Sequence, residues 1–222
     1  MHLPDGVLPI GVIAAGYAGT AALTWYSLRK IKQRGDAQEQ VPRASLLAAG
    51  FFVATLINIP VPPTSVHLVL NGLMGAVLGW YAFPAILVSL FFQAILFGHG
   101  GITTLGVNGV LIGGPALLAA AVFWLRELRF ESRGWTGLCG FLAGATGIAV
   151  GAVAIFTLLI TTIPATLDAA TEQAAIYALT LAHGPLMLIE GAFTALVVLF
   201  LLRVQPKLLQ RRLLRGESMR RA

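Results

Sequence analysis

Long runs of apolar residues dominate the chain, and their lengths predict membrane-spanning helices. A helix needs about 20 apolar residues to cross the hydrocarbon core of a bilayer. The apolar positions are continuous rather than alternating, which favours helices over the strands of a membrane barrel. Marked by their length and by where Lys, Arg and Pro interrupt them, the runs cover residues 8–28, 44–59, 66–97, 107–125, 137–161 and 176–202.

The run 66–97 is too long for one ordinary span, and Pro84 divides it. Proline has no amide proton and disfavours helix at the residue before it. We therefore predict two short helices, about 66–81 and 84–97, and seven helices in total. The expected fold class is all-α, a polytopic transmembrane helix bundle.

All 15 Lys and Arg residues lie in three clusters, within residues 29–43, 126–133 and 203–221. The other predicted loops contain none. Basic residues mark the cytoplasmic side of a membrane protein, and seven spans place all three clusters there. The N-terminus is therefore predicted outside and the C-terminus inside. The net charge of +6 then reflects membrane topology rather than nucleic-acid binding.

Composition agrees with a membrane protein. The chain is 57% hydrophobic and 11% charged, with a mean hydropathy of +0.84, whereas soluble domains carry about 25% charged residues. We expect one integral membrane domain over 1–222. It comprises an external segment, 1–7, a helix bundle, 8–202, and a basic cytoplasmic tail, 203–222. No basic region followed by a cleavage site precedes the first run, so Met1 is expected to be the mature start. The single cysteine, Cys139, allows no disulfide and no cysteine metal site.

Histidine is the commonest protein metal ligand, and all four histidines are predicted near the outer face. His2 lies outside, His67 opens the third helix, His99 follows the fourth, and His183 lies in the seventh. Polar residues at membrane depth are costly and usually functional. The pattern indicates a metal site that opens outward, although His2 taken alone could equally be a polar residue near a terminus.

His2 offers a particular chelate. A free terminal amine, the His2 amide nitrogen and its ring Nδ1 can reach one ion and close adjacent five- and six-membered rings. One further histidine nitrogen completes a square plane, which suits Ni(II), Cu(II) or low-spin Co(II). Since the amide loses its proton, binding should release protons and weaken at low pH.

Pro4-Asp5-Gly6 has the composition of a tight turn, which would fold the terminus over the outer mouth of the bundle. Asp5 either orients a histidine ligand or serves the turn itself.

The motifs together resemble one family. They are Met1-His2-Leu3-Pro4-Asp5-Gly6, Pro60-Val61-Pro62 with Thr64-Ser65-Val66-His67-Leu68, the block from Phe97 to Gly106 with Asn108, and His183-Gly184-Pro185 with Ile189-Glu190-Gly191. This series is similar to the CbiM/NikM family, the nickel/cobalt substrate-binding (S) components of energy-coupling-factor transporters.

The resemblance implies that the ion is held by the Met1 amine, the amide and ring nitrogens of His2, and His67. It places His99 and His183 around these ligands or along the access path. Around His67 the chain has Val69-Leu70-Asn71-Gly72 where the family pattern is richer in glycine. Asn71, one helical turn from His67, could hydrogen-bond to it. Glu190 is expected to be a buried structural carboxylate.

The resemblance implies a multi-pass protein of the bacterial inner membrane that captures Ni²⁺ or Co²⁺ for an ATP-driven uptake transporter. The chain lacks the G-x-x-x-x-G-K-[ST] phosphate loop. It is therefore not expected to be an enzyme, and ATP hydrolysis falls to partners. The implied partners are a transmembrane T component and two cytoplasmic ATPases. A small accessory membrane subunit is left open, and no resident cofactor is expected.

Two other functions use the same residues differently. A membrane haem protein could take His99 and His183 as axial ligands. An intramembrane metalloprotease is disfavoured because the chain has no H-E-x-x-H motif.

Overall fold

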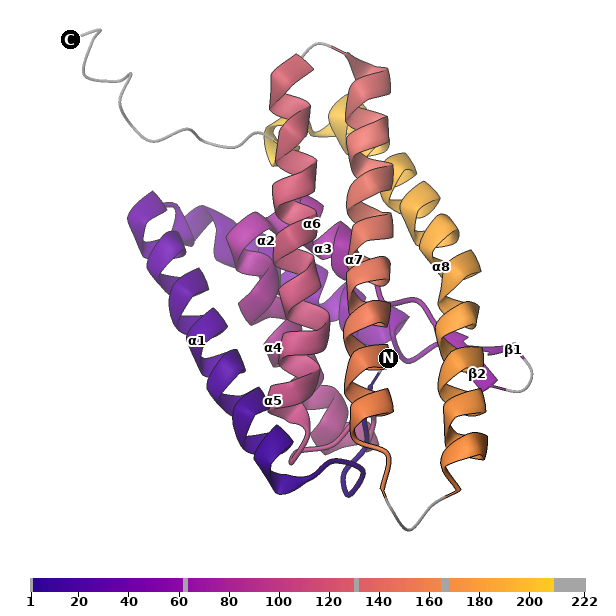
Figure 1. Cartoon of the computed structure of the whole chain (residues 1–222). Helices are drawn as coiled ribbons and strands as arrows, with labels where there is room; N and C mark the ends of the chain where they lie inside the picture. The colour runs from indigo at the N-terminus through magenta and orange to yellow at the C-terminus, as the bar shows by residue number, and fades with distance from the viewer. Residues whose placement is uncertain (1, 62–63, 130–131, 165–167, 210–222) are drawn as a thin grey trace, which may run out of the picture.

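The computed structural model describes residues 2–61, 64–129, 132–164 and 168–209, and shows a helical bundle with one small β-hairpin (Figure 1). The α-helices are α1 (Ile10–Arg34), α2 (Ala37–Ala54), α3 (Asn71–Leu78), α4 (Ala82–Phe97), α5 (Leu105–Asn108), α6 (Gly114–Trp124), α7 (Arg133–Thr161) and α8 (Ala169–Val204). The strands are β1 (Asn58–Val61) and β2 (Thr64–His67), paired antiparallel. A 3₁₀ turn, η1 (Gly79–Tyr81), joins α3 to α4, and a π-helical turn, η2 (Gly109–Gly113), joins α5 to α6. Two further 3₁₀ segments are η3 (Leu125–Arg129) and η4 (Pro206–Leu209).

Four helical stretches are long and apolar enough to cross a membrane: Asn71–Phe97, Leu105–Arg129, Arg133–Thr161 and Ala169–Val204. The predicted polytopic helical architecture is therefore confirmed. The total of seven spans and the orientation of the termini stay predictions.

The second predicted helix, 44–59, is shifted in the structure. α2 already begins at Ala37, and the chain becomes extended at Asn58. The start was misjudged because the first turn of α2 is polar and does not belong to the apolar run. The β-hairpin was not expected, since two short strands leave little trace beside long apolar helices.

α3 is a short helix inside the bundle. Its eight residues span about 12 Å, and all but one of them are buried. Gly75 packs against Ala116 of α6, and Gly79 lies beside Trp124 at the end of α6, so α3 runs parallel to α6. The chain then turns at Gly79, whose φ of 57° and ψ of −122° are readily adopted only by glycine.

α4 runs back in the opposite direction. Phe83 packs against Gly113, and Leu87, one turn later, packs against Gly109. Residue numbers therefore rise along α4 while they fall along the segment that it faces. The break in 66–97 therefore lies at Gly79 and not at the predicted Pro84. Proline is tolerated where it stands because it occupies the first turn of α4, where its missing amide proton is not needed.

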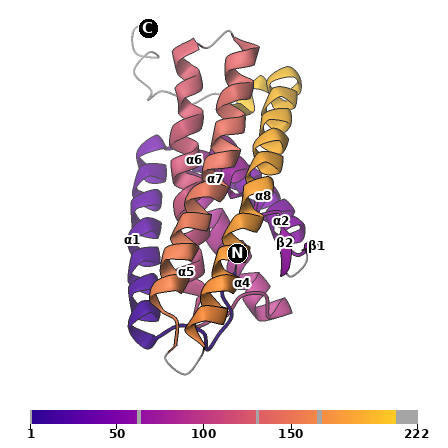
Figure 2. The same cartoon turned by 45° about the vertical axis from the view of Figure 1, so that its right-hand side comes forward.

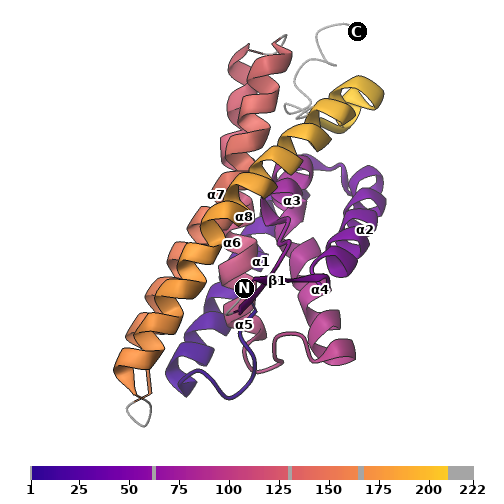
Figure 3. The same cartoon turned by 90° about the vertical axis from the view of Figure 1, so that its right-hand side faces the viewer.

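α7 and α8 form a tightly packed antiparallel pair (Figures 1 and 3). Gly140 of α7 packs against Val198, and Gly144 packs against Gly191 and the carbonyl of Glu190. Small residues at this spacing let helix backbones approach closely in lipid. The glycine stripe of α7 therefore serves packing within the bundle.

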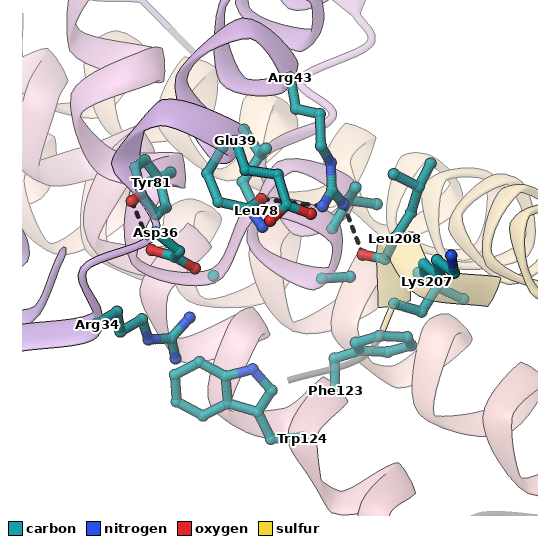
Figure 4. Close-up of a pocket in the computed structure, with 15 residues that line it drawn as sticks. Arg34, Asp36, Glu39, Arg43, Leu78, Tyr81, Phe123, Trp124, Lys207 and Leu208 are labelled. Atoms are coloured by element: carbon teal, nitrogen blue, oxygen red, sulfur yellow. Dashed lines mark hydrogen bonds between the residues drawn. The ribbon is translucent and has the colours of Figure 1, made fainter. Parts of the chain in front are cut away.

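The ends of α1, α6 and α8 lie toward the same side of the bundle, the upper side in Figures 1 and 2, and most of the described basic residues lie in or directly after these ends. Here Tyr81 donates a hydrogen bond to Asp36 (2.8 Å), and Arg43 donates one to the Leu208 carbonyl (2.6 Å). A cavity of about 320 Å³ opens between these groups (Figure 4). It lies toward the opposite end of the bundle from the histidines of the candidate centre described below. The basic residues from Arg211 onward lie outside the described residues.

The close approach of α7 and α8 can be tested with two glycines of the same helix. A Cβ at Gly144 would lie 2.6 Å from the Glu190 carbonyl oxygen, whereas a Cβ at Gly134 would meet nothing within 4 Å. Gly144→Ala should therefore destabilise the fold by about 1–3 kcal/mol through overpacking. Gly134→Ala should be neutral or stabilising by up to about 1 kcal/mol. Thermal unfolding in detergent measures both, and equal melting temperatures would contradict the packing.

Candidate metal centre

Three histidines from distant parts of the chain converge on one point. His2 Nδ1 lies 3.3 Å from His67 Nε2 and 3.1 Å from His99 Nε2. One ring nitrogen from each lies within 4.8 Å of the others. They come from the segment before α1, the end of β2 and the loop after α4. The structure thus brings His99, predicted only near the ligands, as close to His2 as His67 is.

The N-terminal segment is held inside the bundle by the side chain of Asn108. Its Oδ1 accepts from the Leu3 amide (2.9 Å), and its Nδ2 donates to the Leu3 carbonyl (3.0 Å). Leu3 and Leu8 are buried. Figure 3 shows the segment rising from the start of α1 into the interior. The clamp on Leu3 fixes the adjacent His2, while Met1 lies outside the described residues.

Asp5 holds the turn and the loop after α4, not a histidine. Its carboxylate accepts from the amides of Ile102 (3.2 Å) and Thr103 (2.9 Å) and from the Thr103 hydroxyl. The hydrogen bond from that hydroxyl lowers the pKa of Asp5. Of the two roles considered for Asp5, the structure supports the one in the turn, where Gly6 adopts a φ of 84°.

His67 ends a strand and does not open a helix as predicted. Glu190 of α8 accepts hydrogen bonds from the amides of Val69 and Leu70, the latter at 2.9 Å, and α3 begins only at Asn71. Leu70 has a φ of 52°, an uncommon conformation for a residue with a side chain. The helix is delayed because the Glu190 carboxylate binds the amides that precede it. The expectation of a buried, hydrogen-bonded Glu190 is confirmed.

The ring of His67 is oriented by its own backbone neighbour. Nδ1 lies 3.2 Å from the Leu68 carbonyl oxygen, to which it can only donate. A neutral imidazole carries one N–H, so Nε2 keeps its lone pair and directs it at His2. A carbonyl partner on the second ring nitrogen is the usual way in which proteins orient a histidine ligand.

His99 is placed by the way in which α4 ends. Gly98 is left-handed, with a φ of 59°, and the amides of Gly98 and His99 both donate to the Gln93 carbonyl. Glycine favours this conformation at helix C-termini. The chain therefore turns back at Gly98 and carries His99 toward His2.

The three imidazoles are held neutral. Burial is the largest cause in each case: it lowers the pKa of His67 to about 3 and holds those of His2 and His99 below their ordinary value. Neutral rings keep lone pairs, and three lone pairs at these distances repel one another unless a proton or a cation lies between them. The cluster is thus arranged for a positive ion.

Two predicted residues do not join the cluster. His183 donates from Nδ1 to the Leu179 carbonyl (2.7 Å) and lies outside the three-histidine group. Asn71 donates to the carbonyls of Ile112 and Gly147, each at 3.2 Å. The proposed bond from Asn71 to His67 is wrong because it assumed one continuous helix, whereas β2 ends before α3 begins.

Sequence reasoning missed Gln93, which is fully buried in α4 and acts on the imidazole of His2. The available signal was a glutamine inside an apolar run, since amides at membrane depth are costly unless they are bonded.

Comparison with known proteins places this geometry in a family. Residues 2–208 match the CbiM profile, described as the cobalt uptake substrate-specific transmembrane region. The cobalt transport protein CbiM of Sorangium cellulosum is 30% identical over 219 residues, 95% of each chain. The fused nickel transport protein NikMN of Rhodobacter capsulatus is 40% identical over 129 residues, 56% of this chain and 37% of its own length.

A solved structure described as a transition metal transporter shares the fold, with a TM-score of 0.73, 24% identity, and coverage of 92% of this chain and 93% of the other. The match over nearly the whole chain agrees with the apolar helices of a multi-pass inner-membrane protein. The chain therefore belongs to the CbiM family of metal uptake components.

Proposed function

We propose that this chain captures Ni²⁺ or Co²⁺ at the outer side of the membrane, as the substrate-binding subunit of an ATP-driven uptake transporter. The observation that carries the proposal is the convergence of His2 Nδ1, His67 Nε2 and His99 Nε2 within 4.8 Å. Nitrogen donors in a tetragonal arrangement suit these late divalent metals rather than Mg²⁺ or Ca²⁺, which prefer oxygen.

The spacing of the ring nitrogens fits one shared ion. With metal–nitrogen bonds of about 2.0–2.1 Å, neighbouring donors of a square plane lie roughly 2.9 Å apart. The observed separations of 3.3 and 3.1 Å from His2 Nδ1 need only a small contraction around a metal. The ion here is the cargo, so the site must also be able to release it.

The remaining donors are proposed from the chemistry of the terminus. An unblocked Met1 amine and the His2 amide nitrogen would chelate the ion together with His2 Nδ1, and His67 Nε2 would complete the plane. His99 lies on the same ion as a further donor. Its contribution is smaller because, in the described part of the chain, its second ring nitrogen lacks an orienting bond such as the one from His67 to Leu68.

Energy coupling is assigned to partners. We propose a transmembrane T component and two cytoplasmic ATPases, because the chain lacks a phosphate-binding loop. The fused architecture of the nickel transport protein NikMN supports association with at least one further transport component.

The haem alternative has little support in this arrangement. Bis-histidine ligation requires a porphyrin between two imidazoles, yet here three imidazoles converge on the space of one ion, and His183 is not among them. A Soret band in the purified protein would revive that alternative.

Metal binding by the terminus makes a direct prediction. Purified protein with a free N-terminus should bind Ni²⁺ or Co²⁺, and His2→Ala should abolish high-affinity binding by removing both a ring donor and the chelate. An extension or acetyl group on Met1 should do the same because it removes the amine. The same tag at the C-terminus, as the matched control, should leave binding unchanged. Competitive titration with metal analysis measures all four proteins. Normal binding by N-terminally tagged protein would exclude the amine as a ligand.

The two other histidines should differ in importance. His67→Ala should lower affinity more than a hundredfold, because it removes a buried and pre-oriented donor. His99→Ala should lower affinity about 10–100-fold, the range seen when groups around a metal ligand are removed. Titration of both variants, each checked for an unchanged melting temperature without metal, ranks them. The opposite ranking would exchange the two roles.

A further inference from the structure

Gln93 is a polar residue buried in the membrane-embedded part of the bundle, next to the proposed ion. Its side chain is completely buried in α4. Its backbone carbonyl accepts the amide of His99 (3.1 Å). The residue that positions His99 through its main chain therefore also brings an amide side chain to the histidine cluster.

The end of α2 determines which way this amide points. Gln93 Nε2 donates to the Phe52 carbonyl (3.0 Å) and to Thr55 Oγ1 (2.5 Å). The Thr55 hydroxyl gives its own proton to the Phe51 carbonyl (2.8 Å), so it can only accept from Gln93. A reversed amide would place its oxygen against these acceptors. The NH₂ group must therefore face α2, and Oε1 faces the other way.

His2 presents a matching donor. Its Nδ1 faces the rings of His67 and His99, which leaves Nε2 on the other side of the ring. Both His2 Nε2 and Gln93 Oε1 are buried, and within the described residues neither has a hydrogen-bond partner in this structure. The side chain of Gln93 lies close enough to interact with the imidazole of His2.

The geometry points to Gln93 as a positioning residue that sets the tautomer of His2: Nε2–H donates to Gln93 Oε1, so that Nδ1 keeps its lone pair for the ion. This inference rests on the proposed function. A neutral imidazole has one proton for two nitrogens, and a proton on Nδ1 would block the chelate. The partner of the second nitrogen therefore decides whether His2 can bind metal at all.

The same contacts connect the ion to α2. Hydrogen bonds run from the carbonyls at the end of α2 through Thr55 to Gln93, and the inferred bond continues them to the ring of His2. A ring that is metal-bound at Nδ1 gives up more electron density and becomes a better donor at Nε2. Ion binding should thus strengthen the attachment of α2 to α4.

Gln93→Met tests the role, because methionine keeps the length of the side chain and removes its oxygen. The matched control is Ser89→Ala, one turn earlier on α4. Ser89 also makes a buried bond to α2, donating to the Ala48 carbonyl (2.9 Å), and belongs to none of the groups placed around the ion. Gln93→Met should lower Ni²⁺ affinity about 10–100-fold and shift the visible absorption of the bound metal. Ser89→Ala should bind within about twofold of the unaltered protein with an unchanged spectrum.

Nitrogen NMR of protein labelled at its four histidines provides a second, metal-free readout. In the unaltered protein the His2 signal should show the Nε2–H tautomer, and in Gln93→Met a mixture of both. If His2 carries its proton on Nδ1 in the unaltered protein, or if Gln93→Met binds Ni²⁺ like Ser89→Ala, the assignment of Gln93 is overturned. Should Gln93→Met fail to fold, the tautomer of the unaltered protein still decides. Failure of the unaltered protein to bind either metal would instead overturn the proposed function.

Discussion

Non-helical backbone inside a membrane bundle must have its polar groups bonded by the protein, because lipid offers no partners. Two side chains meet this constraint here. Glu190 accepts the amides of Val69 and Leu70, and Asn108 binds both the amide and the carbonyl of Leu3. These bonds help to hold the adjacent histidines, His67 and His2, in the bundle interior, and the Thr104 hydroxyl adds one more to the Leu3 carbonyl (2.6 Å). The candidate metal centre thus depends on two buried side chains that lie outside the histidine cluster.

The centre is arranged for an ion by neighbours that control its protons. Leu68 takes the proton of His67 Nδ1, and Gln93 is inferred to take that of His2 Nε2. Each of these two rings then directs a lone pair at the same point. Burial lowers the pKa of all three imidazoles, which keeps them neutral and ready to bind. In the proposed function, an ion at this point would therefore meet donors that the fold has already brought together.

The long helices could be predicted from the sequence, whereas the turns between them could be predicted less well. α7 and α8 could be located because 20 or more apolar residues have no other stable arrangement in lipid. The reversal at Gly79 was placed at Pro84 instead, since proline is the stronger helix breaker in a sequence, whereas the φ of a glycine is set by what surrounds it. The hairpin β1–β2 and the separation of His67 from Asn71 were missed for the same reason. Four-residue strands have no apolar period long enough to detect.

By itself, the sequence determined that the chain is a helical membrane protein with its basic residues in three clusters, and that His2 and His67 are candidate ligands. The first conclusions and the choice of His2 follow from composition, run length and the chelating chemistry of a terminal histidine, which are local properties, whereas the choice of His67 followed from the family resemblance. Only the tertiary structure decided that His99 joins them, that Asp5 and Asn71 bind backbone rather than histidine, and that the amide of Gln93 binds the end of α2. Those assignments depend on contacts between residues up to about a hundred positions apart. The order of residues does not give the distances between side chains, and these distances determine which donor meets which acceptor.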